Sequence, residues 1–109
     1  MRLSEALLKG AKIRPQCMGQ FFVMDQDGKV YACALGSIIE AFTGRVEHTT
    51  YNLPEDALKV LRTGAKCPAC KALDSEAVSV QQIVAHLNDA SHGWTREKIA
   101  TDFLVPLGL

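Results

Sequence analysis

Apolar residues recur at helical spacing in several separate segments of the chain. In Leu3 to Lys12 they follow one face of a predicted helix, and Ser4 is placed to cap its start. The segment Cys33 to Phe42 is apolar on nearly every side, which is typical of a helix buried in a core, and Gly44 is placed to end it. Because Gly36 costs this helix about 1 kcal/mol relative to alanine, we expect a close packing contact there.

A third helix is predicted from Pro54 to Arg62, with the proline in its first turn and Gly64 beyond its end. Leu58 and Leu61 lie three positions apart and so share one face of this helix. We expect both side chains to point into the core.

The two C-terminal helices have the clearest start signals in the chain. Ser79 can cap the first, and Gln82 can return the hydrogen bond in a capping box. Thr95 can cap the second, with Trp94 and Ile99 as the apolar pair that flanks such a cap. We therefore expect Trp94 to be buried. The short turn between these helices should make them neighbours in space.

A β-hairpin is predicted at about residues 20–32. Phe21 to Val23 form a β-prone run, Asp25 to Gly28 are rich in turn-forming residues, and Val30 and Tyr31 resume the strand pattern. A calcium loop is the alternative for the Asp-x-Asp-Gly string, but Ser37 and Ile38 occupy the place of the distal glutamate. The pattern as a whole predicts a mainly α (α+β) fold, with four or five short helices around one core in a single domain, residues 1–109.

The composition limits the classes of partner and the cellular compartment that we expect for this protein. The 109 residues carry no net formal charge, and the two halves of the chain are each nearly balanced. No basic stripe is present to neutralise a run of phosphates, which disfavours nucleic acid as a partner. The apolar runs are too short to cross a membrane, and the N-terminus lacks the order of a signal peptide. We therefore expect a cytoplasmic protein with no membrane partner.

The cysteine count directs attention to metal or thiol chemistry. The chain has four cysteines, Cys17, Cys33, Cys67 and Cys70. In a reducing compartment, metal ligation or redox chemistry is more common than a disulfide framework. Cys33 begins an apolar helix and is most simply a small buried side chain.

Cys67-Pro68-Ala69-Cys70 is the strongest chemical signal in the sequence. Two intervening residues let both thiolates reach one tetrahedral ion, and His86 and His92 follow at roughly the spacing of a two-cysteine, two-histidine zinc site. We expect His92 to be the third zinc ligand, with His86 or one of the other cysteines as the fourth. His86 could instead be a core side chain, since it lies in an apolar helical run, and the cysteine pair could be only a tight turn.

Thiol redox is the competing chemistry for the cysteine pair. A low-pKa redox cysteine usually sits at a helix N-terminus after a strand, and the residues before Cys67 do not read as a strand. No glycine-rich phosphate loop, Ser-His-Asp set or paired carboxylates are visible, so no catalytic residue and no organic cofactor is predicted.

Several strings resemble a small family of uncharacterised bacterial and phage-associated proteins. They are Leu-Ser-Glu-Ala at Leu3 to Ala6, Arg-Pro-Gln at Arg14 to Gln16, Cys-Ala-Leu-Gly at Cys33 to Gly36, Cys-Pro-x-Cys at Cys67 to Cys70, and His-Leu-Asn-Asp to Trp-Thr-Arg-Glu-Lys-Ile-Ala at His86 to Ala100. The resemblance spans most of the chain. It implies a fold and the positions of motifs, but no activity.

The first functional hypothesis is a non-catalytic structural or interaction module, stapled by a zinc knuckle and binding a protein partner. The second is a small nucleic-acid-associated regulator that uses the C-terminal helix pair and the side chains of Arg2, Lys9, Lys12 and Arg14. A thiol redox protein is the third.

Overall fold

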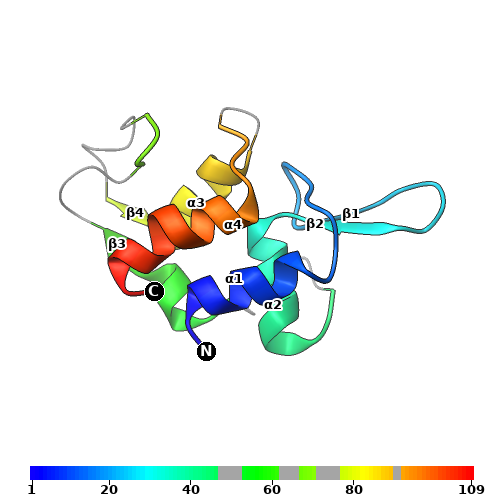
Figure 1. The fold of residues 1–109 in the computed structure, drawn as a ribbon, viewed down its shortest axis with the longest axis horizontal. Coiled ribbons are helices and arrows are strands. Elements are labelled where there is room, and N and C mark those ends of the chain that lie inside the picture. Colours follow the sequence, from blue (N-terminus) through cyan, green and yellow to red (C-terminus); the bar gives the residue numbers. More distant parts are fainter. Residues whose placement is uncertain (47–52, 62–66, 71–76, 90–91) are drawn as a thin grey trace.

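The computed structural model describes residues 1–46, 53–61, 67–70, 77–89 and 92–109. Short helices pack around a common core, and a small hairpin extends from it (Figure 1). This confirms the predicted α+β class with a hairpin. Within the described residues, no helix has the length and apolar character needed to span a bilayer.

Helix α1 (Leu3–Ala11) packs closely on helix α2 (Ala34–Thr43). Gly10 makes this approach possible, because a side-chain carbon there would overlap the Ser37 carbonyl. The prediction that Ser4 caps α1 is wrong. The residue at the cap position is Arg2, two positions before Ser4, and the Ser4 backbone N–H and hydroxyl both donate to the Leu109 carbonyl, at 3.1 and 3.2 Å. The two ends of the chain are thereby held together.

Helix α2 lies at the centre of the molecule, and its residues Ala34 to Glu40 are all buried. Cys33 is its N-cap, with Sγ accepting a hydrogen bond from the Gly36 N–H at 3.4 Å, and Gly44 ends it with φ of 74°. A side-chain carbon at Gly36 would overlap the Phe21 carbonyl. The close contact that the sequence predicts at Gly36 is therefore present.

The hairpin consists of β1 (Phe22–Met24) and β2 (Val30–Ala32), which pair antiparallel and project away from the helices (Figure 1). The Asp25 carboxylate accepts hydrogen bonds from the backbone N–H groups of Asp27 and Lys29, both at 2.9 Å. These bonds and that from the Tyr31 hydroxyl hold the pKa of Asp25 below its usual value. The aspartate thus serves the predicted turn.

The prediction of a helix from Pro54 to Arg62 is wrong. The structure has a single 3₁₀ turn, η2 (Glu55–Leu58), followed by strand β3 (Val60–Leu61), which pairs with β4 (Val78–Ser79); Arg62 lies outside the described residues. The helical conformation ends at Lys59. The backbone polar groups that follow pair with β4, so they do not need the hydrogen bonds of a further helical turn. Leu58 is 46% exposed and does not point inward, whereas Leu61 packs against the core.

Helix α3 (Val80–Asn88) starts with the predicted capping box, in which Ser79 and Gln82 exchange hydrogen bonds. The C-terminal helix also starts as predicted, with the Thr95 hydroxyl accepting from the Lys98 N–H at 3.1 Å. It runs through α4 (Arg96–Lys98), a π-helical stretch η3 (Ile99–Leu104) and a final 3₁₀ turn η4 (Val105–Leu107).

The prediction that Trp94 is buried is also wrong, because its side chain is only partly buried. Its ring lies at the edge of the core, with the Lys98 ammonium 4.4 Å from the ring centroid. Ile99, its predicted partner, is fully buried. The predicted turn between α3 and α4 includes residues 90 and 91, which lie outside the described residues.

Candidate metal centre

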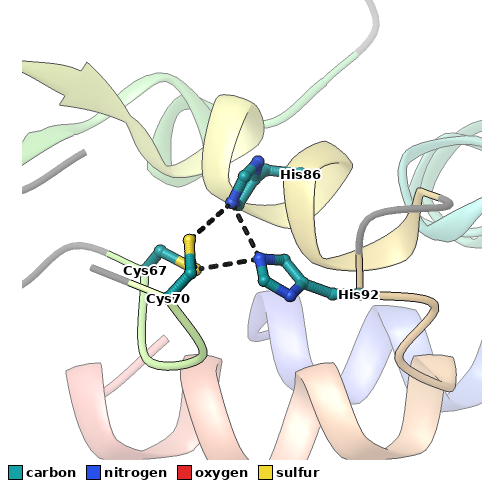
Figure 2. Close-up of side chains that lie close together, drawn as sticks. All are labelled: Cys67, Cys70, His86 and His92. Atoms are coloured by element: carbon teal, nitrogen blue, oxygen red, sulfur yellow. Dashed lines mark hydrogen bonds between the residues drawn. The ribbon is translucent and has the colours of Figure 1, made fainter. Parts of the chain in front are cut away.

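Four side chains from three segments converge on one point beside α3 (Figure 2). Cys67 and Cys70 come from the short turn at 67–70, His86 from α3, and His92 from the loop that precedes α4. One ligand atom from each residue lies within 4.8 Å of the others. The structure therefore brings together all the metal ligands that the sequence predicts.

The four contacts that form the cluster are short. The two Sγ atoms are 3.5 Å apart, and the Nε2 atoms of the two histidines are 3.0 Å apart. Cys67 Sγ lies 3.6 Å from His92 Nε2, and Cys70 Sγ lies 3.3 Å from His86 Nε2. Both imidazoles present the same nitrogen to the cluster, so each could ligate through Nε2 and keep its proton on Nδ1.

These distances can be compared with the edges of a tetrahedral zinc site. Bond lengths of about 2.3 Å to sulfur and 2.0–2.1 Å to nitrogen imply edges of about 3.8 Å between sulfurs, 3.6 Å from sulfur to nitrogen and 3.3 Å between nitrogens. The observed 3.5, 3.6, 3.3 and 3.0 Å each lie within about 0.3 Å of the corresponding edge. The other two pairs, Cys67 with His86 and Cys70 with His92, lie within 4.8 Å. Four of the six edges therefore match those of a tetrahedral zinc site.

The turn at 67–70 places its two sulfurs in different surroundings. Cys67 is completely buried and belongs to the core, whereas Cys70 is exposed. Their separation of 3.5 Å is much longer than a disulfide bond of about 2.05 Å, so the two residues are not crosslinked. One thiol is therefore anchored in the core, and the other faces the solvent side of the site.

His86 lies at the edge of the apolar face of α3. Ile83 and Leu87 on this helix are fully buried, while His86 is partly exposed and its ring meets that of His92 edge-on, with centroids 4.6 Å apart. His86 is thus part of the cluster and is not a core side chain.

Backbone hydrogen bonds hold His92 close to the end of α3. The N–H groups of His92 and Gly93 both donate to the Asp89 carbonyl, at 3.0 and 2.7 Å. Gly93 has φ of 60°, and the Trp94 N–H donates to the Leu87 carbonyl at 2.9 Å. Residues 92–94 are therefore fixed against the end of the helix, where the His92 ring lies beside that of His86.

Asn88 is an important structural residue that the sequence patterns do not single out. It is almost fully buried at the end of α3, where its Oδ1 accepts hydrogen bonds from Gln16 Nε2 (2.8 Å) and the Ala34 N–H (3.0 Å). Its Nδ2 donates to the Cys17 carbonyl at 3.0 Å. A polar residue four positions after Val84 on the buried face was the available signal.

The other two cysteines lie outside the cluster. Burial raises the pKa of Cys33 to about 11, and its sulfur caps α2. Burial also raises the pKa of Cys17, whose Sγ donates to the Gln20 carbonyl at 3.4 Å. Of the alternatives that the sequence leaves open for a fourth ligand, the structure places His86 at the site.

Two arginines of the proposed nucleic-acid surface have structural partners. Arg14 makes a bidentate ion pair with Glu40, at 2.8 and 2.9 Å, and this hydrogen bonding raises the Arg14 pKa. Arg96, on the capped C-terminal helix, is buried and donates to the Ser37 hydroxyl and the Ala11 carbonyl. Its burial lowers its pKa. Neither guanidinium is presented as an open phosphate contact.

Comparisons with protein-family models, curated proteins and solved structures gave no match. The resemblance to bacterial and phage-associated proteins therefore stays a prediction. The functional inference rests on the cluster itself, which can hold a metal ion.

Proposed function

We propose that the chain is a non-catalytic structural module whose fold is completed by one zinc ion bound to Cys67, Cys70, His86 and His92. The observation that carries this proposal is the convergence of four ligand atoms within 4.8 Å of one another, with four of their separations close to the edges of a tetrahedral site. Its proposed biological role is interaction with a protein partner.

The donor atoms favour zinc among the common metals. Calcium and magnesium are bound by oxygen ligands, and the cluster has two sulfurs and two imidazole nitrogens. A tetrahedral site with two sulfur and two nitrogen ligands is typical of zinc. Two thiolates also balance the charge of a divalent ion.

The number of protein ligands supports a structural role. Catalytic zinc sites keep one position open for water or substrate, whereas structural sites are closed by four protein ligands. Here the four ligands would fill the coordination sphere. The ion would then join the turn at 67–70 to α3 and to the loop before α4, which lie up to 25 residues apart along the chain.

Metal content and thermal unfolding together test this proposal. We expect one zinc per chain in purified protein by plasma emission spectroscopy, and a lower melting temperature after chelation, because binding to the folded state adds to stability. Cys67→Ser should lose the zinc and the response to chelator. Cys17→Ser is the matched control, since Cys17 lies outside the cluster, and it should keep both. A metal-free native protein that melts identically with and without chelator contradicts the proposal.

A further inference from the structure

We propose that the Cys67–Cys70 pair is also a modification site, at which hydrogen peroxide joins the two sulfurs in a disulfide and releases the metal. This inference rests on the proposed zinc function and adds a form of regulation to the same site. It follows from the separation of the sulfurs and from their unequal exposure.

The sulfurs are already close to bonding distance. They are 3.5 Å apart, so an approach of about 1.5 Å would bring them to a disulfide length of about 2.05 Å. Both belong to one four-residue turn, and no rearrangement of the helices is needed for the approach. Of the two, Cys70 is exposed and Cys67 is fully buried. Peroxide therefore meets Cys70 first, and Cys67 lies behind it as the resolving thiolate.

The remaining cysteines are protected from this reaction. Only the thiolate form of cysteine attacks peroxide efficiently. Cys33 is buried and its pKa is raised to about 11, and burial also raises the pKa of Cys17, which disfavours the thiolate form of both. A bound zinc ion, in contrast, holds its cysteine ligands in the thiolate form. Oxidation is thus directed to the pair that holds the metal.

The reaction balances in two steps. The Cys70 thiolate attacks one peroxide oxygen, the O–O bond breaks, and the departing hydroxide takes up a proton to become water, which leaves Cys70 as a sulfenic acid. The Cys67 thiolate then attacks that sulfur, the S–S bond forms, the S–O bond breaks, and the second hydroxide is protonated to water. The cysteine pair has lost two electrons, and peroxide has accepted them.

Disulfide formation removes half of the ligand set. Disulfide sulfurs carry no negative charge, so His86 and His92 would be the only ligands left from the cluster, and zinc leaves as the hydrated ion. The turn at 67–70 then loses its connection through the metal to α3 and to the loop before α4. A dithiol reductant restores both thiolates and allows zinc to bind again.

The test uses the full chain with its zinc content measured first. Protein at one zinc per chain is treated with graded hydrogen peroxide, zinc release is followed with a metal-binding dye, and the cysteines are mapped by mass spectrometry. We expect complete release, with one Cys67–Cys70 disulfide for each zinc freed, and recovery of zinc binding after dithiol treatment. Cys17→Ser should behave as wild type.

Cys70→His supplies the variant that keeps a ligand but cannot form the disulfide. It should hold zinc at peroxide concentrations that empty the wild type, and if it does not fold, the wild-type map decides alone. Zinc retained by oxidised wild type, or release accompanied by oxidation of Cys17 or Cys33 without the Cys67–Cys70 disulfide, overturns the inference. Protein that binds no zinc before peroxide is added overturns the proposed function as well, so the two failures are distinguishable.

Discussion

Asn88 shows how one buried amide can position the helix that carries His86. It joins the end of α3 to the first turn of α2 and to the segment that contains Gln16 and Cys17. His86 lies two residues before it, so these bonds fix the end of α3 on which the histidine depends. Arg96 has a related role, since its guanidinium joins the carbonyl at the end of α1 to Ser37 on α2.

Asn88→Ala should lower the free energy of unfolding by about 2–4 kcal/mol, because several buried polar groups would lose their partner. Urea unfolding of the zinc-loaded protein measures this change. Lys12→Ala, at an exposed position, is the control and should change stability by less than about 0.5 kcal/mol. An equally small effect of Asn88→Ala would mean that water replaces the amide and that the residue is not a structural link.

At the scale of the elements, local signals predicted most of the fold. The capping box at Ser79, the apolar run of α2 and the turn at Asp25 each specify their structure through residues within one or two turns. The segment after Pro54 was predicted wrongly because its conformation depends on pairing with β4, nearly 20 residues away. The spacing of the cysteines and histidines predicted the residues of the cluster although they lie up to 25 positions apart, because zinc ligands recur at characteristic intervals.

The rest of the site could not be predicted because its contacts are distant in sequence. Asn88 bonds to residues 54 and 72 positions away, and no local pattern encodes either partner. The place of Asn88 on the buried face of α3 is visible in the sequence, but its hydrogen-bond partners are identified only by the tertiary structure.

The cap of α3 is the element that can be tested most simply. Ser79→Ala removes the hydroxyl that accepts from the Gln82 N–H, and should cost about 1 kcal/mol of stability. Ser79→Asp is the matched variant, because aspartate is an equally good cap and should restore most of the loss. Thermal unfolding of the three proteins checks the order. A Ser79→Asp protein no more stable than Ser79→Ala would show that capping does not limit this helix.

At the scale of the molecule, the core and the cluster connect distant parts of the chain in different ways. The core includes residues from Leu3 to Leu109, and the Leu109 carbonyl accepts hydrogen bonds from Ser4. The cluster adds a second connection between these parts. Among its four residues, Cys67 is the one that also belongs to the core. A metal ion would therefore stabilise the relative positions of the turn at 67–70, α3 and the C-terminal helix. The contact between α1 and α2 lies outside the cluster and would still depend on apolar packing.

X-ray absorption spectroscopy at the zinc edge tests the central claim most directly, because it identifies the atoms bound to the ion. On protein that carries one zinc per chain, we predict two sulfur neighbours at about 2.3 Å and two nitrogen neighbours at about 2.0–2.1 Å, with histidine scattering. Cys70→His, which keeps four ligands, should reduce the sulfur count to one, whereas Cys17→Ser should leave the spectrum unchanged. A spectrum with no sulfur in the first shell, or a protein that does not bind zinc stoichiometrically, would contradict the four-ligand site.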